Sequence, residues 1–509
     1  MLFFYINKKY ERRLLQVIMR LKQNSIIKTI AVLLLLLLLN SANISAAGNI
    51  FYVTPSDPEN DVEGDGSYEN PWRNLQDVIS KKVETRCSKN SPYDGELIIK
   101  NEGAPIKTGD TIILKDGFYS ILSISHAFNE DYITLKAENK HQAVFSHINI
   151  SSASHWILEG LAVNREIEKI EPEQQHDPKA NQLMRLVSGW HGPVQYITIE
   201  ECDFFTISDT STWSKEDWDD GTVNGIWSSG EFITINNNHI MNINYGIVIQ
   251  GGSNTIVSNN LIEEITADGL QGIGDDLLFE NNIIKNFYQV DGNHLDGFQS
   301  WIVPPNDPNG DSCDRITLRG NIIIEHEDRT HPYKASLQGI GCFDGPYYDW
   351  VIENNVIIVG HYHGITMSGA QNCKVINNTV VSPVDSDISN PHIKIGNTKG
   401  GLPSQNVIVR NNIARRFDIF DKDDESIIMD HNLEVSNSDY DLLFINHANN
   451  DLHLRPGSLA INTGSSELAP DIDIEGNPRP HGSEYDIGAY EYLGEFALPP
   501  AAPENLEVE

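Results

Sequence analysis

A short apolar pattern recurs through the middle of the chain, and it constrains the fold more than any other feature. Seven copies have an apolar residue, an Asn three positions later and a second apolar residue two positions after that, and two earlier copies have Leu or Cys in place of the Asn. The central position of successive copies falls at Leu161, Cys202, Asn238, Asn260, Asn282, Asn321, Asn355, Asn378 and Asn412. Asn238, Asn260 and Asn282 are each 22 residues apart. A repeat of this period is typical of a solenoid, in which stacked units bury one continuous core.

The composition of each repeat favours strands over helices. Apolar and polar residues alternate around the central Asn, as they do in a strand with one buried face. Asn-Asn pairs suit the bends between strands, because Asn tolerates left-handed backbone and bonds to neighbouring backbone groups. We therefore predict an all-β fold, a right-handed parallel β-helix with three strands per coil and an internal Asn ladder. A leucine-rich-repeat solenoid is the alternative, but its LxxLxL skeleton is missing.

The two ends of the chain differ from the repeats. Lys28 precedes an unbroken apolar run, residues 30–39, and a polar stretch then ends at Ser45-Ala46-Ala47. This order is typical of a cleavable signal peptide, and the run is too short to span a bilayer as a helix; an uncleaved anchor is the alternative. We expect a signal at 1–47 cleaved near Ala47, a β-helix at 48–495 and a Pro-rich tail at 496–509. The mature protein would be secreted or periplasmic, monomeric and without a transmembrane segment.

The charge of the mature chain limits its partners. Residues 1–47 hold seven Lys/Arg and one acid, so their removal leaves 29 basic and 71 acidic residues, a net charge of −42. Such an excess argues against nucleic acid, whose binding depends on Lys and Arg. The chain has five Cys and no CxxC pair, so a zinc site is not expected. Cys342 and Cys373 fall on adjacent predicted coils, where a disulfide is one option.

A second set of predicted strands follows each Asn turn. Most have Gly in second place and an apolar residue in third place, as in Asp296-Gly297-Phe298-Gln299. Because strand side chains alternate, the fourth position should point outward when the third points inward. The expected outward ladder is Gln271, Gln299, Gln338, Thr366 and Lys394. The long gaps between repeats should hold loops, several of which would wall one groove; the inserted segments are 166–183, 208–222, 303–314, 325–334 and 382–404.

Several motifs at the two ends of the predicted β-helix carry a family resemblance. The opening 51–53, 65–67 and 70–72 are followed by 107–112 and 116–119, and the chain closes with 477–480 and 486–491. With these motifs, the chain resembles secreted right-handed parallel β-helix polysaccharide lyases of the alginate and chondroitin type over about 50–495. The resemblance implies an exported lyase whose partner is an anionic polysaccharide, with alginate as the first candidate. Fold alone does not imply function.

The section from 294 to 399 concentrates the groups that such a reaction needs. Residues 313–416 hold ten Lys/Arg and nine Asp/Glu, so this section is nearly neutral in a strongly acidic chain. Elimination from a uronate first requires that the C6 carboxylate be neutralised, so that the C5 proton becomes acidic. Arg329, His331 or Lys394 could neutralise it, and a Ca²⁺ ion could do so instead. No other cofactor and no set of metal ligands is assigned.

The reaction also requires a base for the C5 proton and an acid for the leaving O4. Lys334 is the first candidate for the base and His331 the second, while Tyr333 or His363 could be the acid. Asp296 would orient a histidine or position the sugar. The candidate substrate-binding residues are His294, Gln299, Arg329, Gln338 and Lys394. Each of these side chains could instead be an ordinary surface or turn residue.

Two other functions fit the same predicted fold. Residues 293–297, 363–365 and 392–394 are similar to three motifs of polygalacturonase-type hydrolases, although no Asp-Asp pair lies between Asp296 and His363. Inversion would need two carboxyl groups roughly 6.5–9.5 Å apart, and Asp344 is the obvious partner for Asp296. A non-catalytic glycan-binding protein would instead have an aromatic-lined groove without a base.

Overall fold

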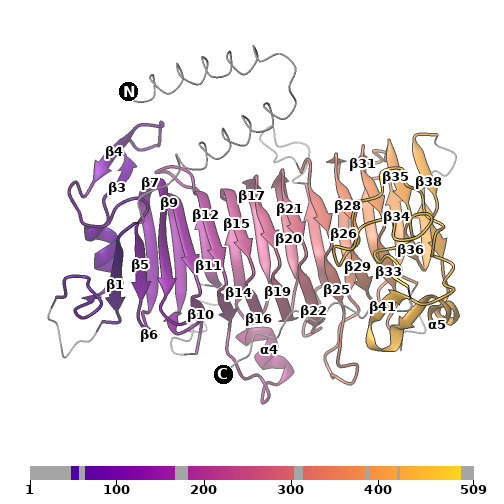
Figure 1. Ribbon diagram of the computed structural model, residues 1–509, viewed down its shortest axis with the longest axis horizontal. Coiled ribbons are helices and arrows are strands. Elements are labelled where there is room, and N and C mark those ends of the chain that lie inside the picture. Colours follow the sequence, from indigo (N-terminus) through magenta and orange to yellow (C-terminus); the bar gives the residue numbers. More distant parts are fainter. Residues whose placement is uncertain are drawn as a thin grey trace, which may run out of the picture. The chain divides into compact units, whose positions relative to one another are not determined.

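Parallel strands stack coil upon coil in the computed structural model, and they form the right-handed parallel β-helix that the repeats predict (Figure 1). The structure describes residues 48–56, 63–166, 181–302, 313–384, 390–420 and 425–494. The expected signal peptide at 1–47 and the tail at 496–509 lie outside these ranges. Among the described residues, no helix is both long and apolar enough to cross a membrane.

Each full coil contributes three strands, which belong to three faces of the β-helix. In one coil these are β15 (Glu231–Asn236), β16 (His239–Ile243) and β17 (Ile247–Ser253). The face of β15 continues with β18 (Ile256–Ser258), β21 (Leu278–Glu280), β24 (Thr317–Arg319), β28 (Val351–Glu353), β32 (Lys374–Ile376), β35 (Val407–Arg410) and β38 (Ile427–Asp430), and it is preceded by β12 (Gln195–Glu200).

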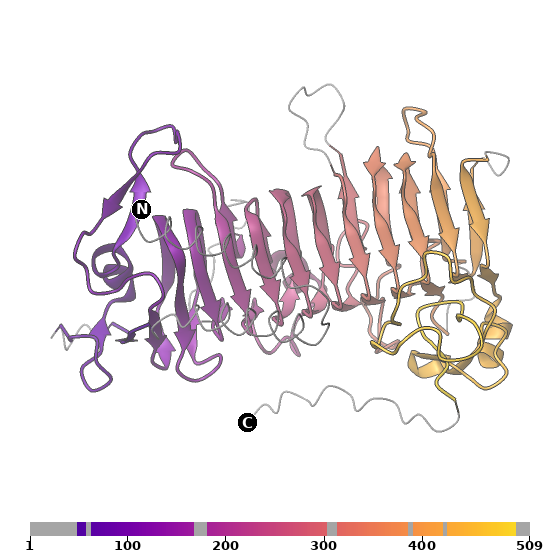
Figure 2. The same ribbon diagram turned by 45° about the horizontal axis from the view of Figure 1, so that its top comes forward.

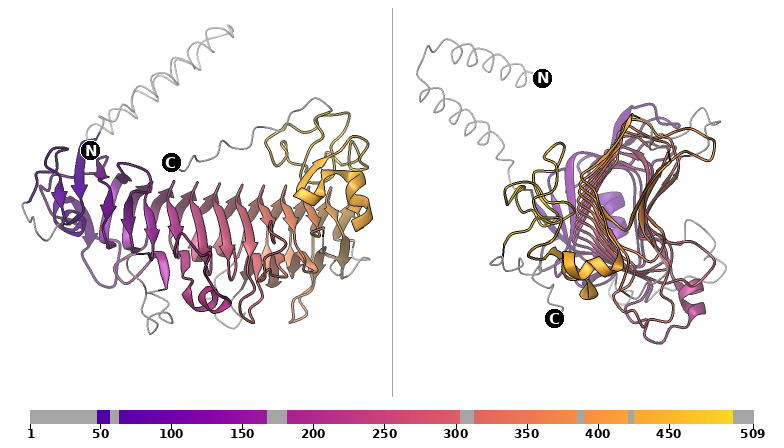
Figure 3. Two further views of the ribbon diagram at one scale, coloured as in Figure 1. Left: turned by 90° about the horizontal axis from the view of Figure 1, so that it is seen from below. Right: turned by 90° about the vertical axis from the view of Figure 1, so that its right-hand side faces the viewer.

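The other two faces are built in the same way. The face of β16 comprises β6 (Gly117–Phe118), β8 (Ala143–Phe145), β10 (Ala162–Asn164), β13 (Asp203–Phe205), β16, β19 (Leu261–Ile265), β22 (Ile283–Phe287), β25 (Ile322–Ile324), β29 (Val356–Ile358), β33 (Thr379–Val381), β36 (Ile413–Ala414) and β39 (Leu433–Glu434). The face of β17 comprises β11 (Gln182–Val187), β14 (Asn224–Ser228), β17, β20 (Leu270–Asp275), β23 (Asp296–Trp301), β26 (Gln338–Asp344), β30 (His363–Ser368), β34 (His392–Gly396) and β37 (Arg416–Ile419). Viewed along the stack, the strands of successive coils superimpose (Figure 3).

Separate elements flank the stack of coils. The N-terminal end comprises β1 (Ile50–Thr54), β2 (Trp72–Arg73), α3 (Leu75–Asp77), the π-helix 78–82, the hairpin β3 (Thr85–Ser88) and β4 (Leu97–Lys100), β5 (Thr111–Leu114) and the long strands β7 (Ile121–Ala137) and β9 (His147–Glu159). The C-terminal element comprises α5 (Tyr440–Leu443), β40 (Phe444–Asn446) and β41 (Asp451–Leu454), with short 3₁₀ turns (Figure 2), and it packs against the outer side of β25, β29, β33 and β36. Residues beyond β41 bind the last coils, where Asn377 Nδ2 donates to the Gly488 carbonyl at 3.1 Å.

The predicted internal Asn ladder is present and confirms the role assigned to the repeat. Asn282 Nδ2 donates to Asn321 Oδ1 at 2.9 Å and to the Val257 carbonyl at 2.9 Å. The same pattern links Asn238 to Asn260 and continues through every later repeat to Asn432. These amides are buried, so each must be hydrogen-bonded within the core to avoid the cost of desolvation. The ladder therefore fixes how successive coils stack.

Stacked glycines fix the start of each strand on the face of β17. A Cβ at Gly246 would lie 2.2 Å from the Gly269 carbonyl oxygen, and a Cβ at Gly339 would lie 2.2 Å from that of Gly364. No side chain fits at such distances. The column runs through Gly225, Gly246, Gly269, Gly297, Gly339 and Gly364. The residues immediately before these glycines therefore form one row across the face, which we call the pre-glycine row.

The glycine column corrects the predicted register of one strand. The sequence pattern predicts a strand at 335–338, with Gln338 in the outward ladder beside Gln299. In the structure β26 begins at Gln338, which pairs with Asp296, while Gly341 pairs with Gln299. The reason is that Gly339 must align with Gly297, which moves the strand by three residues. The disulfide suggested between Cys342 and Cys373 is absent, and both thiols are free and buried.

Candidate active site

Two adjacent outward rows on the face of β17 bring the candidate residues together. The first is the pre-glycine row, which includes Asp268, Asp296, Gln338 and His363, and His392 pairs with His363 on the next strand. The second, which we call the outer row, follows three residues later on most strands. It runs through Gln271, Gln299, Gly341, Thr366 and Lys394.

Side chains of the two rows pair within each strand. Gln271 Nε2 donates to Asp268 Oδ2 at 2.7 Å, and Gln299 Nε2 donates to Asp296 Oδ2 at 3.1 Å. His363 Nδ1 lies 2.7 Å from Thr366 Oγ1. Both members of each pair lie outside the apolar core of the β-helix, although Asp268, Gln271 and Asp296 are themselves buried. The outward ladder predicted from the sequence is therefore present, except that Gly341 stands where Gln338 was expected.

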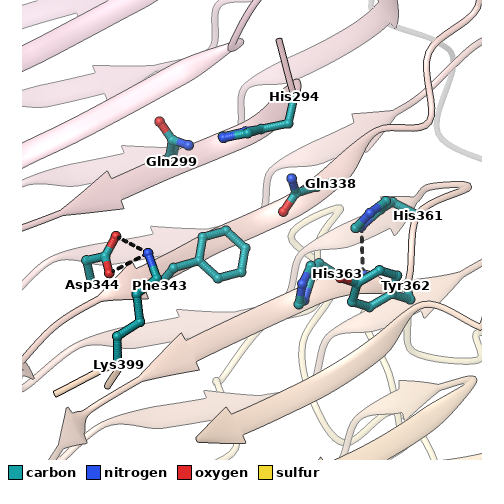
Figure 4. A pocket seen from close by; sticks show the side chains of 9 residues that line it. All are labelled: His294, Gln299, Gln338, Phe343, Asp344, His361, Tyr362, His363 and Lys399. Atoms are coloured by element: carbon teal, nitrogen blue, oxygen red, sulfur yellow. Dashed lines mark hydrogen bonds and ion pairs between the residues drawn. The ribbon is translucent and has the colours of Figure 1, made fainter. Parts of the chain in front are cut away.

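A pocket of about 340 Å³ opens over β23, β26 and β30 (Figure 4). Its lining residues are His294, Gln299, Gln338, Phe343, Asp344, His361, Tyr362, His363 and Lys399. Four of these, His294, Gln299, Gln338 and His363, belong to the site predicted from the sequence. At the end of the pocket away from the histidines, Lys399 Nζ lies 3.0 Å from Asp344 Oδ1. Basic, aromatic and amide groups therefore line most of the pocket.

Asp296 lies fully buried beside this pocket, and one of its carboxyl oxygens has no partner. Oδ2 lies 3.1 Å from His294 Nδ1 and also accepts from Gln299, whereas Oδ1 makes no hydrogen bond among the described residues. A Cβ at Gly341 would lie 2.4 Å from this Oδ1, so only glycine leaves room for the carboxyl group. Burial, together with the negative charge of Asp268, raises the pKa of Asp296 well above its usual range. These surroundings favour the protonated form of Asp296.

Three histidines crowd the other side of the pocket. The ring centroid of His363 lies 5.2 Å from that of His361 and 5.5 Å from that of His392, and Tyr362 packs against His363 at 4.1 Å. Burial and the neighbouring His361 lower the pKa of His363 to about 3, and burial lowers that of His392 to about 4. These imidazoles are therefore neutral at neutral pH, and each can accept a proton.

Two more buried atoms near the histidines lack partners. Gln338 Oε1 and His392 Nε2 make no hydrogen bond among the residues that the structure describes. Gln338 lies between Asp296 and the histidines in the pre-glycine row. Because buried polar atoms are normally paired, each of these atoms requires an explanation, such as an ordered water or ion. Gln338 lines the pocket, whereas Asp296 and His392 are not among its lining residues.

The remaining predicted residues lie elsewhere. His331 and Tyr333 line a separate cavity of about 530 Å³ together with Trp213 and Trp218. Its rings stack on one another, with Tyr288 4.1 Å from His331 and 4.7 Å from Trp218 between centroids. This cluster joins two of the inserted segments, the one that contains α4 (Lys215–Gly221) and 325–334, so two insertions do wall one cavity. The cavity differs from the pocket that holds His363.

Lys334 and Arg329 belong to neither lining. Lys334 Nζ donates to the Arg329 carbonyl at 3.2 Å, and Arg329 Nη2 donates to Asn450 Oδ1 at 3.4 Å in the C-terminal element. Both contacts direct these side chains away from His363. The structure therefore does not bring the first candidate base, Lys334, to the pocket. Lys394 lies in the outer row beside Thr366, close to the histidines.

Sequence reasoning left four residues of the pocket and the neighbouring His392 without a role: the four are His361, Tyr362, Phe343 and Lys399. These residues become neighbours only when the coils stack, and the order of residues along the chain does not show which side chains then meet. His392 had a signal in the sequence, because it lies in the predicted strand 391–394, which follows the predicted strand of His363 in the same set. Across the described ranges, no group of three or more His, Cys, Asp or Glu side chains is arranged to hold a metal ion.

Comparisons with known proteins bear on the fold. The family model described as a right-handed β-helix region matches residues 194–294 and 224–413. No curated protein matches the chain. Similar solved structures include pectate lyase Pel9A, with 16% identity, a TM-score of 0.43 and coverage of 89% of this chain and 98% of that one.

Two further solved structures have other activities in their names. A mutant of the PL6 family alginate lyase AlyGC has 14% identity, a TM-score of 0.41 and coverage of 64% of this chain and 49% of that one. The GH136 lacto-N-biosidase from Eubacterium ramulus has 11% identity, a TM-score of 0.39 and coverage of 76% of this chain and 68% of that one. These likenesses are too distant to indicate an activity, so any function assigned to the chain rests on the site itself.

Proposed function

We propose that this chain is an exported polysaccharide lyase that cleaves an acidic, uronate-containing polysaccharide by β-elimination, with alginate as the first substrate to test. One observation carries the proposal. Asp296, whose pKa is raised by burial, and His363, whose pKa is lowered by burial, flank Gln338 in a single row, and Gln338 and His363 line one pocket. These shifts favour a protonated acid and a neutral base, which elimination at neutral pH requires.

The local charge supports an anionic substrate. The whole chain carries a formal charge of −36, yet Lys394 and Lys399 lie near the pocket with three imidazoles that can gain protons. Lys394 and His392 are the groups that would neutralise the C6 carboxylate, since His392 has an unpaired buried nitrogen. A carboxylate bound beside the histidines would also offset the unfavourable burial of their charged forms, and their pKa values would rise. Lys399 is already paired with Asp344.

Asp296 and His363 are two strand steps apart, which is about 10 Å between their backbones. Their side chains would have to approach neighbouring positions of one sugar, O4 and the C5 hydrogen. His363 would remove the C5 proton, and the electron pair of that C–H bond would form the C4–C5 double bond. The C4–O4 bond would break, and O4 would leave with the proton of Asp296. Gln338, which lies between the two and lines the pocket, would hold the ring through its amide group.

These roles replace those predicted from the sequence. Lys334, His331 and Tyr333 were the first candidates for base and acid, and the proposal now assigns them to loop structure. His363 moves from candidate acid to base, and Asp296 from an orienting residue to the acid. Arg329 leaves the substrate-binding set, whereas His294, Gln299, Gln338 and Lys394 remain in it.

The hydrolase alternative has less support from the register. Asp344 lies six residues along β26 from Gln338, the residue that pairs with Asp296. Six strand residues span about 20 Å, which is well beyond the roughly 6.5–9.5 Å that an inverting pair of carboxyl groups requires. The nearer carboxylate, Asp268, is buried and accepts hydrogen bonds at both oxygens. It is therefore poorly placed to act as a nucleophile.

The test is to incubate the purified protein with alginate, pectate and chondroitin, and to follow ultraviolet absorbance and polymer length. The proposal predicts shortening of at least one polymer, with new absorbance from an unsaturated uronate. Shortening with new reducing ends but without absorbance would indicate hydrolysis. Binding without any shortening would indicate a glycan-binding protein. Either of the last two results would overturn the proposed elimination.

A further inference from the structure

A second cavity lies between two of the inserted segments, and the proposed reaction does not use it. Its volume is about 530 Å³, within the roughly 300–1,000 Å³ of pockets that bind small ligands. Glu264 of β19 lines one side, and the two insertions contribute residues from 210–218 and 326–333. The exposed residues Ser211 and Asp328 belong to the lining, so the cavity opens to solvent.

Aromatic rings at steep angles to one another form much of the lining. The ring plane of Trp218 makes an angle of 82° with that of Trp213 and 75° with that of Tyr288, and the centroids are 4.9 Å and 4.7 Å away. Tyr333 lies at 77° to His331, which stacks on Tyr288. Rings at right angles cannot form one flat platform, so they border the cavity from several directions. A compact group inside it would be surrounded, as in the aromatic cages that hold ammonium groups.

A carboxyl group without a partner lines the same space. Among the described residues, Glu264 makes neither a hydrogen bond nor an ion pair. Burial, followed by the charge of Glu263, raises the pKa of Glu264. Burial and then the charge of Glu264 raise the pKa of Tyr288, so the carboxyl group lies near that ring. A cation bound in the cavity would supply a close counter-charge and favour the ionised form of Glu264.

The other charges around the cavity do not favour an anion. Among the described residues, the lining contains no Lys or Arg. Burial lowers the pKa values of His326 and His331, so both imidazoles are neutral at neutral pH. Lys285, close to the cavity, is already paired with Glu327 at 2.8 Å. The acidic polysaccharide of the proposed reaction is therefore not the ligand expected here.

Hydrogen bonds hold in place both insertions that carry the rings. Thr222 Oγ1 donates to the Trp218 carbonyl at 2.9 Å just beyond α4, and a capping box begins that helix at Ser214. In the other insertion, His326 Nε2 accepts from the Ala335 N–H at 3.1 Å. The rings are therefore positioned before a ligand arrives, which lowers the entropic cost of binding.

We propose that this cavity binds a compact organic cation, a substituted ammonium group held among the rings of Trp213, Trp218 and Tyr288 and beside the carboxylate of Glu264. Tyr and Trp rings attract a cation within about 6 Å of their centres, and more strongly where water is excluded. A neutral sugar could pack on the rings but would gain nothing from the charge of the carboxylate. The inference is independent of the proposed function, because it requires no cleavage beside His363.

The test is calorimetry with choline and with neohexyl alcohol, its uncharged isostere in which carbon replaces the quaternary nitrogen. We expect the wild type to bind choline at least tenfold more tightly than the alcohol. Glu264→Gln should weaken choline binding at least tenfold and change alcohol binding less than twofold, whereas Trp213→Ala should weaken both. The controls are Glu102→Gln and Trp190→Ala, at exposed positions outside the cavity, which should bind choline as the wild type does.

Four results would overturn the proposal: no binding of choline at millimolar concentrations, equal affinity for choline and the alcohol, unchanged choline binding in a folded Glu264→Gln variant, or binding of methyl glucoside but not of choline. The last of these would assign the cavity to a neutral sugar. Circular dichroism establishes that each variant is folded. Because Gln has nearly the shape of Glu, the Glu264→Gln comparison decides the question even if Trp213→Ala does not fold.

Discussion

The backbone N–H of Asp296 donates a 3.0 Å hydrogen bond to Oδ1 of Asp268, the residue at the same position on the preceding coil. The two carboxyl groups are therefore neighbours, but their surroundings differ. Asp268 accepts hydrogen bonds at both oxygens, whereas Asp296 has one oxygen without a partner among the described residues and faces the charge of Asp268. The difference keeps the proton on Asp296, as a catalytic acid requires.

Replacing Asp296 with Asn should lower the activity and, at high pH, raise the stability of the fold. The variant has no proton to give, so kcat should fall by about 10²- to 10⁴-fold. Folding raises the pKa of the carboxyl group above its ordinary value of 3.8, so its contribution to stability is fully present below that pH and is lost as the pH rises through the higher pKa of the folded state. Asn does not titrate, so thermal melts at pH 9 should show a higher Tm than the wild type.

The control for this experiment is Asp349→Asn, at an exposed turn with a left-handed backbone that Asn accepts readily. It should leave both kcat and Tm unchanged. An active Asp296→Asn variant would remove Asp296 from its role as the acid.

His363 should determine the acidic limit of activity. Its lowered pKa, about 3, leaves the imidazole neutral and able to accept a proton at higher pH. We expect kcat/KM to be nearly constant from about pH 4 to pH 8, to fall below this range as His363 becomes protonated, and to fall above it as Asp296 loses its proton. His363→Gln should reduce kcat by at least 100-fold. His431→Asn, at an exposed left-handed turn, should be as active as the wild type.

Gly341 should be required for the geometry of Asp296. A Cβ at Gly341 would lie 2.4 Å from Asp296 Oδ1, so Gly341→Ala must displace the carboxyl group. We expect a loss of activity of at least tenfold, with a Tm lowered by a few degrees, as measured by kinetics and calorimetry. Gly396→Ala is the matched control, because the nearest atom to its Cβ would be 3.6 Å away on the flexible Lys394 side chain. Equal activity in both variants would show that the space that Gly341 leaves for the Asp296 carboxyl group is not needed for catalysis.

Lys334 and His331 should now behave as structural residues. Lys334→Ala should retain kcat/KM within about twofold, because its Nζ contacts the Arg329 carbonyl rather than the pocket. His331→Ala should lower Tm, since it removes the ring stacked 4.1 Å from Tyr288. A large loss of kcat in a folded Lys334→Ala variant would restore the assignment made from the sequence.

Chelation provides a separate check on how the substrate carboxylate is neutralised. Lys394 and the unpaired nitrogen of His392 supply this function in the proposal. Activity should therefore persist in excess chelator, and Lys394→Ala should raise KM for the polymer. Activity that disappears with chelator and returns with added Ca²⁺ would assign neutralisation to the metal ion.

The fold could be predicted from the sequence because its repeating unit is local. The Asn of each repeat is visible in the chain, and the ladder from Asn238 to Asn432 follows from stacking alone. Asp296, His363 and Lys394 each have a definite position within a predicted strand. The sequence therefore also predicts that they lie close together once the strands stack. The rows on which they lie follow from the same periodicity.

The rest of the site depended on loops and register, which the repeat does not determine. Lys334 and His331 are close to Gln338 in sequence, but their loop turns toward the cluster around Tyr288. The predicted position of Gln338 was wrong by three residues, because the Gly column, rather than the apolar pattern, aligns β26 with β23. Protonation states also depended on burial, so the role of Asp296 emerged only when its surroundings were known.

Cleavage in water enriched in heavy oxygen tests the central claim most directly. Elimination breaks the C4–O4 bond without adding water, so mass spectrometry should find unsaturated products with no heavy oxygen at the new ends. Together the fragments should have the mass of the starting chain. Products that gain one heavy oxygen per cleavage and carry no double bond would contradict elimination and establish hydrolysis.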